Sequence, residues 1–204
     1  MTTREPVGVF ILAGGRSSRM GRAKGLLTFD GEPLIVHVAR LVELTCETPV
    51  VIGPPDVYAN LGFRVVPDDD ENLGPLGGIS TALRIAKREW NLIAGCDLPF
   101  LTREWLEFLI AQTNGSAADV VIPENERGLE PLCAMYRKRA QPAIAEALSR
   151  GVRKITDGLA GLILASIAHA EWKAFDPNGR LFKNVNTPED YDEARESLGE
   201  ETAS

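Results

Sequence analysis

The chain has 204 residues, of which 44% are hydrophobic and 25% are charged, and its formal net charge is −7. This composition predicts one globular domain, residues 1–204, with its core between about residues 7 and 195. The acidic balance argues against a nucleic-acid-binding surface, and the chain lacks the run of about 18 apolar residues that would span a membrane. Three cysteines at unrelated positions and a polar start, without a signal-peptide pattern, lead us to expect a cytoplasmic protein.

The expected elements alternate between strands and helices. In chain order we expect strands at 7–13, 49–52, 63–66, 91–95, 119–122 and 131–136, and helices at 34–44, 77–87, 104–111, 142–148 and from Pro188 onward. A tight turn is expected at Asp30–Gly31. The alternation predicts an α/β fold with a doubly wound, mainly parallel sheet covered on both faces. His37, expected in a helix, and His169, expected in a strand, are interpreted as structural residues.

Glycines and basic residues follow the first expected strand. Gly14 and Gly15 come directly after it. The basic residues within the segment 16–24 are Arg16, Arg19, Arg22 and Lys24. Glycine lets backbone N–H groups approach a phosphate closely, and Arg and Lys neutralise its charge. Because ligands bind beyond the carboxyl ends of parallel strands, the segment predicts a phosphate-binding loop. The alternative is a tight strand-to-helix turn with exposed basic residues.

Two common phosphate-binding motifs do not fit this loop. A Walker A motif requires Gly-Lys-Ser/Thr, whereas Lys24 lies between Ala23 and Gly25. A dinucleotide-binding motif requires G-x-G-x-x-G and an acid near the end of the second strand, but the segment 51–53 supplies no acid. The sequence therefore indicates a nucleotide site of another class.

Acidic residues follow the third and fourth expected strands. Asp97 comes directly after the strand at 91–95 and Cys96, at the same sheet edge as the glycine-rich loop. A single carboxylate with room for water suits Mg²⁺, which also binds substrate phosphates, so we predict that Asp97 is a metal ligand. The alternative is a turn or helix-capping Asp. Asp68 begins an acidic run that is either a solvated loop or a ligand contact. Cys96 is interpreted as a small core residue rather than a nucleophile.

A series of short motifs occurs in one order along the chain. They are Leu12-Ala13-Gly14-Gly15, Arg19-Met20-Gly21, Lys24, Gly74-Pro75-Leu76-Gly77-Gly78, Cys96-Asp97-Leu98-Pro99, Glu130-Pro131-Leu132 with Tyr136, and Asn184-Val185-Asn186-Thr187-Pro188-Glu189-Asp190. The ordered series resembles the molybdenum cofactor guanylyltransferase family. The resemblance implies a nucleotide-diphospho-sugar-transferase-like fold. It also implies transfer of GMP from GTP to molybdopterin or the molybdenum cofactor, with release of pyrophosphate.

The resemblance further implies roles for individual residues. Nucleotide contacts would come from Leu12, Ala13, Gly14, Gly15, Lys24, Asp68 and Asp97. Gly77, Gly78, Asn184 and Asn186 would lie near the acceptor or the nucleotide, and we assign them to the acceptor. Asp97 would hold Mg²⁺, and Arg19 and Lys24 would stabilise the leaving pyrophosphate. The attacking phosphate is already anionic, so the reaction needs no general base. Transient contact with cofactor-insertion proteins or client molybdoenzymes would fit this role.

Several positions and alternatives bear on the choice of substrate. Ala23 stands where the family often has Asp, and Gly53 stands where it often has Asn, which removes one candidate base or ribose contact. The Gly14-Gly15 pair favours guanine, because related cytidylyltransferases tend to have Ala at the first of these positions. The alternatives are a molybdopterin cytidylyltransferase, another NTP transferase with this fold, such as a sugar-phosphate guanylyltransferase, and a non-catalytic nucleotide-binding module.

Overall fold

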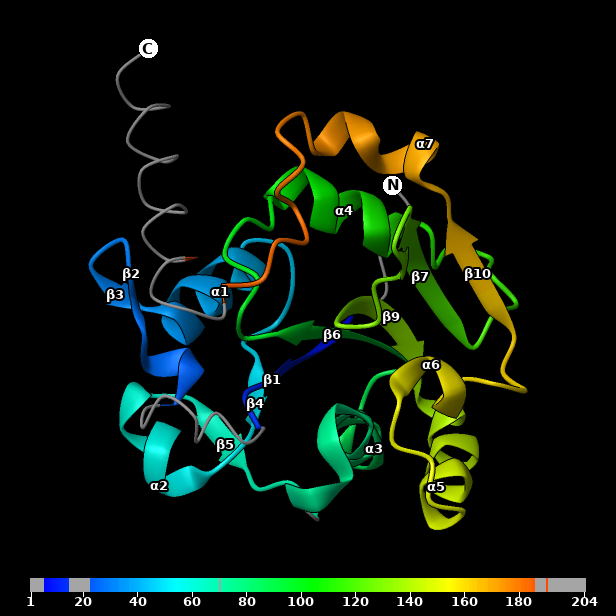
Figure 1. Cartoon of the computed structure of the whole chain (residues 1–204), viewed down its shortest axis with the longest axis horizontal. Coiled ribbons are helices and arrows are strands. Elements are labelled where there is room, and N and C mark those ends of the chain that lie inside the picture. Colours follow the sequence, from blue (N-terminus) through cyan, green and yellow to red (C-terminus); the bar gives the residue numbers. More distant parts are fainter. Residues whose placement is uncertain (1–5, 15–22, 70, 186–189, 191–204) are drawn as a thin grey trace.

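The computed structural model describes residues 6–14, 23–69, 71–185 and 190, and its centre is an eight-stranded sheet (Figure 1). The strand order is β10-β7-β9-β6-β1-β4-β5, with β8 paired to β7. The strands are β1 (Gly8–Leu12), β4 (Val50–Ile52), β5 (Arg64–Val66), β6 (Trp90–Gly95), β7 (Val120–Asn125), β8 (Gly128–Leu129), β9 (Cys133–Arg137) and β10 (Leu164–Ile167). A separate two-stranded ribbon consists of β2 (Thr28–Phe29) and β3 (Glu32–Pro33).

Helices cover both faces of this sheet (Figure 1). One face packs against α1 (Leu34–Glu43), α4 (Arg103–Ala111) and α7 (His169–Trp172), and the other against α3 (Gly74–Ile85), α5 (Gln141–Ser149) and α6 (Ile155–Gly158). A short helix, α2 (Pro55–Tyr58), precedes β5. No helix in the described part of the chain is long and apolar enough to cross a membrane.

The central strands are apolar because helices cover both of their faces. Every residue of β6 is buried, and β1 is buried from Val9 to Leu12. Strands of this kind are typical of parallel sheets, where neither face meets water. The pairs β1–β4, β1–β6, β4–β5 and β7–β10 are parallel. The predicted doubly wound, mainly parallel α/β sheet is therefore confirmed, and β9 is the central exception because it runs antiparallel to both β6 and β7.

Local sequence signals also account for several element ends. Asp30 and Gly31 have φ values of 48° and 81°, so the β2–β3 ribbon closes through the predicted tight turn. The Thr102 hydroxyl accepts a hydrogen bond from the backbone N–H of Trp105 at 3.2 Å and caps α4. Pro142 lies in the first turn of α5, where the missing N–H costs nothing.

Some expectations about the elements need correction. His169 begins α7 rather than lying in a strand, because β10 ends at Ile167 and the Glu171 carboxylate accepts a hydrogen bond from the backbone N–H of Ala168. The helix expected at 77–87 begins at Gly74, and β9 begins at Cys133 rather than at residue 131. The helix start expected at Thr187 and Pro188 lies outside the described residues.

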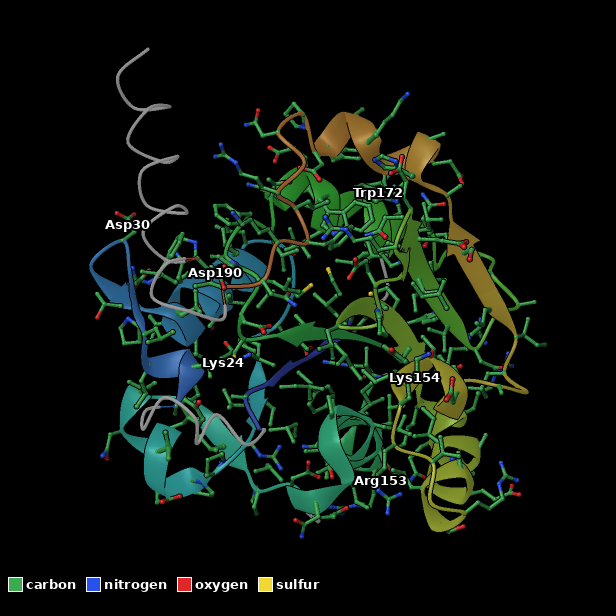
Figure 2. The ribbon with its side chains drawn as sticks, viewed as in Figure 1. Lys24, Asp30, Arg153, Lys154, Trp172 and Asp190 are labelled. Carbon is green, nitrogen blue, oxygen red and sulfur yellow. The ribbon has the colours of Figure 1, made fainter. Side chains whose placement is uncertain are left out.

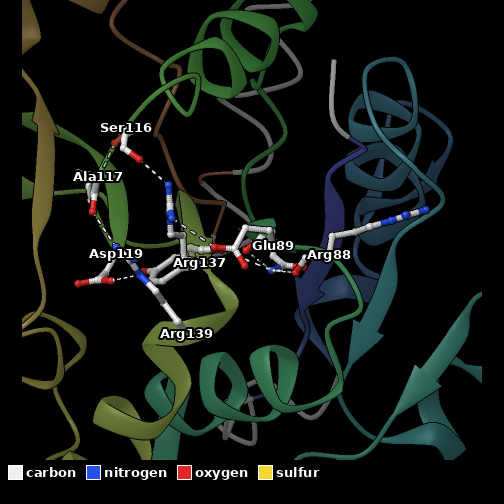
Figure 3. A network of polar contacts seen from close by, with 10 residues as sticks. Arg88, Glu89, Ser116, Ala117, Asp119, Arg137 and Arg139 are labelled. Atoms are coloured by element: carbon white, nitrogen blue, oxygen red, sulfur yellow. Dashed lines mark hydrogen bonds and ion pairs between the residues drawn. The ribbon is translucent and has the colours of Figure 1, made fainter. Parts of the chain in front are cut away.

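A network of ion pairs and hydrogen bonds lies at the amino ends of strands β6 and β7 (Figure 3). Arg139 Nε lies 2.7 Å from Asp119 Oδ1, just before β7, and Arg137 NH1 lies 3.3 Å from Glu89 Oε1, just before β6. The Arg137 guanidinium also donates to the Ser116 carbonyl and sits 4.7 Å from the centre of the Trp90 ring. These contacts tie the carboxyl end of β9 to the amino ends of β6 and β7.

Asp119 provides a test of how much this network stabilises the fold. Burial raises the pKa of Asp119, but the Ile163 N–H and the Arg139 guanidinium more than offset this effect and lower it below its ordinary value. The ionised carboxylate therefore stabilises the fold above the unfolded-state pKa, and this contribution is lost as the pH falls through the lowered pKa. We expect Asp119→Asn to reduce the free energy of unfolding by about 1–3 kcal/mol at pH 7. Urea titrations should show this difference shrinking in acid, and a pH-independent difference would contradict the ionic explanation.

Candidate active site

The space beyond the carboxyl ends of β1 and β6, called the crevice below, lies at the point where the order of the strands reverses. After β1 the chain proceeds to β4 and β5 on one side, and it then returns to form β6 on the other side of β1. The two strands pair in parallel, with Leu12 opposite Gly95, and the Cys96 N–H donates to the Leu12 carbonyl at 3.1 Å. In open α/β sheets ligands bind at such a reversal, beyond the carboxyl ends of the strands. Ala13 and Gly14, which follow β1, and Asp97, which follows β6, therefore leave the sheet side by side.

Asp97 lies within this crevice with its charge largely shielded from water. Its side chain is 16% exposed, and Oδ2 lies 3.8 Å from Lys24 Nζ. Burial raises the pKa of Asp97 above its ordinary value, and the nearby Lys24 ammonium partly offsets this increase. Such a carboxylate is stabilised by added positive charge, so the site favours a cation or a basic side chain beside Asp97.

Lys24 reaches Asp97 from a 3₁₀ turn, Lys24–Leu26, whose position depends on Gly25. A Cβ at Gly25 would lie 3.0 Å from the Tyr58 hydroxyl oxygen and 3.3 Å from Ile35 Cβ, so the turn packs against α1 and α2 only because this residue has no side chain. Burial raises the pKa of the Tyr58 hydroxyl, and a hydrogen bond from the Gly25 backbone partly offsets this effect. Tyr58 is a residue that the sequence analysis missed, because nothing in the sequence links it to Lys24.

The ends of β1 and β4 pack closely on the side expected to hold the nucleotide. The Ala13 N–H donates to the Ile52 carbonyl at 2.8 Å, and a Cβ at Gly53 would lie 3.2 Å from the Ala13 carbonyl oxygen. Gly53 stands where the family often has Asn. Because it has no side chain, it lets the end of β4 approach Ala13. Leu12 and Ala13 are buried, whereas Gly14 is exposed.

Asp68, Gly77 and Gly78 lie together beside the end of β1. The buried Thr81 hydroxyl donates to Asp68 Oδ1 at 2.9 Å, which holds this half-buried carboxylate against α3. A Cβ at Gly77 would lie 3.5 Å from Asp68 Oδ2, and one at Gly78 would lie 3.4 Å from the Leu12 methyl carbons. The structure thus groups these two glycines with the expected nucleotide contacts, and their contact with the acceptor stays a prediction.

The segment that carries Asn184 reaches the site from the far end of the chain. The Val185 N–H donates to the Asp97 carbonyl at 3.0 Å. Asn184, which is exposed, is the residue directly before Val185. Aromatic packing holds this segment in place, since the ring centres of Phe182 and Trp105 lie 5.5 Å apart and those of Phe182 and Trp172 lie 4.9 Å apart (Figure 2 labels Trp172).

Three other predicted site residues, Gly15, Arg19 and Asn186, lie outside the described part of the chain.

The other reactive side chains nearby have structural surroundings. Cys96 is 7% exposed, and burial raises the pKa of its thiol to about 12, so it remains protonated at neutral pH. His37 Nε2 lies 3.0 Å from the Pro99 carbonyl oxygen, and its ring packs against Phe29. The expectation that Cys96 is a core residue is confirmed, whereas the structural role of His37 stays a prediction that these contacts support.

A hollow of about 390 Å³ lies near the amino end of β6, at the opposite end of the strands from this site, and does not belong to it. Its lining includes Glu89, Lys138 and Arg139, and none of the predicted substrate contacts. Arg139 is already paired with Asp119, so the hollow offers less positive charge than its composition suggests.

Comparisons with known proteins agree with this geometry. Residues 9–164 match the family model described as the MobA-like NTP transferase domain. A protein of Pelotomaculum thermopropionicum named "Probable molybdenum cofactor guanylyltransferase" is 37% identical, covering 91% of this chain and 90% of that protein. A protein of the same name from Flavobacterium johnsoniae is 31% identical, covering 95% of this chain and 99% of its own length.

Solved structures show the same relationship. Molybdopterin-guanine dinucleotide biosynthesis protein A from Archaeoglobus fulgidus has a TM-score of 0.82 at 27% identity, covering 95% of this chain and all of that one. The 2-C-methyl-D-erythritol 4-phosphate cytidylyltransferase of Thermus thermophilus has a TM-score of 0.69 at 15% identity, covering 96% and 99% of the two chains, and shares the fold alone. Fold, site and family model together define an NTP transferase domain. The chain belongs to the molybdenum cofactor guanylyltransferase family.

The contact between Gly25 and Tyr58 leads to a prediction about nucleotide binding. Gly25→Ala should displace the turn that carries Lys24 and lower kcat/KM for the nucleoside triphosphate by about tenfold or more, because small misplacements of a binding group are costly. In a Tyr58→Leu background the same change should cost less, since both Tyr58 atoms near the new methyl group, the hydroxyl oxygen at 3.0 Å and Cε1 at 3.1 Å, are gone. Steady-state kinetics of the two single variants and the double variant measure this coupling. Strictly additive losses would show that the contact does not position Lys24.

Proposed function

We propose that this chain transfers GMP from GTP to molybdopterin or the molybdenum cofactor, producing the guanine dinucleotide form and pyrophosphate. The observation that carries the proposal is the Lys24–Asp97 pair, 3.8 Å apart at the carboxyl ends of β1 and β6. The names of the relatives with 31–37% identity support the choice of substrates. All three cysteines lie in the described part of the chain as thiols, which fits a reducing cytoplasm. We also propose that the product is passed to molybdoenzymes through transient contacts.

The reaction asks little of the protein beyond binding and charge neutralisation. A phosphate oxygen of the acceptor forms a bond to the α-phosphorus of GTP, and the bond from that phosphorus to the β-phosphate bridging oxygen breaks. In this proposal Lys24 neutralises charge that develops on the leaving pyrophosphate, and Arg19 from the adjoining loop assists it. The backbone of Leu12, Ala13, Gly14 and Gly15 lines the nucleotide, with Asp68 beyond it. In this proposal the site holds the attacking phosphate oxygen, the α-phosphorus and the leaving oxygen in line, which supplies much of the rate enhancement.

The residues around Asp97 fit a magnesium ion that is shared with the substrate. The described residues contain no group of three His, Cys, Asp or Glu side chains that could hold a metal alone. Mg²⁺ is commonly held by one or two carboxylates together with water and substrate phosphates, and a buried carboxylate with a raised pKa is stabilised by such a cation. We therefore propose that Asp97 holds Mg²⁺. When bound, the ion neutralises phosphate oxygens near the site of attack.

Replacement of Asp97 separates catalysis from stability. Asp97→Asn should lower kcat by about 10²-fold or more, because the group that holds the metal is lost. The folded-state pKa of Asp97 is raised, so the ionised carboxylate costs stability above its unfolded-state pKa. Asp97→Asn should therefore leave the free energy of unfolding at pH 7 unchanged or increase it. Pyrophosphate release and urea titration measure the two effects, and near-normal turnover at limiting Mg²⁺ would refute the role.

The choice of base gives a second test of the proposed function. We expect kcat/KM for GTP to exceed that for CTP and ATP by about 10²-fold or more, as is usual when buried polar groups lose their partners. Lys24→Ala should lower kcat/KM for all three nucleotides by a similar factor, because its charge acts on the shared triphosphate. Measuring turnover with molybdopterin and each nucleotide tests both statements. Equal use of GTP and CTP would remove the guanylyl assignment and leave the transferase.

A further inference from the structure

The Glu130–Leu132 segment has no role in the site described so far, although its last residue, Leu132, is hydrogen-bonded to Gly95, two residues before Asp97. The Gly95 N–H donates to the Leu132 carbonyl at 2.8 Å, and a Cβ at Gly95 would lie 3.7 Å from Leu132 Cβ and 2.6 Å from Asp97 Oδ1. This segment therefore borders the crevice on the β9 side, whereas Asp68 and Gly53 border it on the β4–β5 side.

Hydrogen bonds from two strands hold the segment rigidly. The Glu130 N–H donates to the Pro123 carbonyl at 2.8 Å, which ties the segment to β7. The hydroxyl of the buried Tyr136, on β9, donates to the Pro131 carbonyl at 2.8 Å. A side chain carried on such a backbone is pre-organised for binding, because little conformational freedom is lost when a ligand docks.

The Glu130 carboxylate is half-buried and has a fixed orientation. Asn125 Nδ2 donates to Glu130 Oε1 at 2.5 Å, and Asn125 Oδ1 in turn accepts the Arg127 N–H at 2.7 Å, so both ends of the Asn125 amide are used. Burial raises the pKa of Glu130, and Asn125 and Arg127 only partly offset this effect. Within the described part of the chain, the hydrogen bond from Asn125 goes to Oε1, so Oε2 can accept from another donor. A half-buried carboxylate is stabilised when such a donor binds.

The position of the segment indicates which substrate it meets. If the nucleotide occupies the β4–β5 side of Asp97, the acceptor approaches from the β9–β7 side, where Glu130 lies. The acceptor carries a pterin ring, whose 2-amino group and N3–H form two adjacent donors. A carboxylate presents two acceptor oxygens at a matching spacing, and Oε1 keeps a second lone pair beside the one that accepts from Asn125.

We propose that Glu130, oriented by Asn125, binds the 2-amino and N3–H edge of the acceptor's pterin ring. The inference rests on the proposed function, because it takes a pterin as the acceptor. Glu130 is thus a specificity-determining residue, whereas Asn125 is a positioning residue. Tyr136 fixes the backbone on which Glu130 is carried.

Two small probes test the proposal without the intact acceptor. Pterin has the donor–donor edge, whereas lumazine has oxygen in place of the 2-amino group and so presents a donor and an acceptor. The wild-type protein with saturating GTP and Mg²⁺ should bind pterin about tenfold or more tightly than lumazine, the effect of one well-placed hydrogen bond to a charged group. Glu130→Gln offers one acceptor and one donor, so it should lose this preference or reverse it. Fluorescence titration of both probes measures the ratio.

A matched variant and a second ligand separate the outcomes. Glu126→Gln makes the same charge change at an exposed position near the β7–β8 turn, and it should leave the pterin-to-lumazine ratio unchanged. The affinity for GTP should be unaltered in both variants. An unchanged ratio in Glu130→Gln, a loss confined to melting temperature, or no pterin binding by the wild type would overturn the proposal. If GMP transfer to molybdopterin persists in that case, the proposed function stands; if the wild type transfers no GMP, that function fails first.

Discussion

The parallel pairing of β1 with β6 is the constraint on which the rest of the site depends. The two strands are neighbours in the sheet, yet β4 and β5 lie on the far side of β1 and β9 lies on the far side of β6. Their carboxyl ends therefore lie at the point where the strand order reverses, which is where open α/β sheets bind ligands. Leu12 and Asp97 are brought together by this pairing, although they are far apart in the sequence. Lys24 and the segment that contains Asn184 and Val185 then reach Asp97 from two further parts of the chain.

Charged residues have different roles at the amino ends and at the carboxyl ends of the central strands. At the amino ends of β6 and β7, Arg137 and Arg139 meet Glu89 and Asp119, and the pKa of Asp119 is lowered. This arrangement stabilises the fold. At the carboxyl ends, the pKa values of Asp97 and Glu130 are raised by burial despite nearby cations or donors. Carboxylates that remain costly to ionise in the folded protein are what a binding site for cations and hydrogen-bond donors requires.

Glycine has a packing role in this site as well as the expected role near phosphate. Gly25 lets the turn that carries Lys24 lie against Tyr58, and Gly53 lets β4 lie against Ala13. Gly77 and Gly78 bring the first turns of α3 against Asp68 and Leu12. A side chain at any of these positions would displace a residue that we propose as a substrate contact, so kinetic effects of such changes would report on positioning.

The sequence by itself determined the class of fold, the family and the two strand ends at which we propose the active site. Buried parallel strands are continuous apolar runs, so β1 and β6 and the residues after them, Gly14 and Asp97, can be identified from local patterns alone. The antiparallel direction of β9, the role of Tyr58 and the place of Glu130 could only be decided by the tertiary structure. Strand direction and long-range contacts depend on which distant segments pack together, and the pKa of a carboxylate depends on burial by residues that are not its neighbours in the chain. His169 illustrates the same limit, since its helix begins where β10 leaves the sheet.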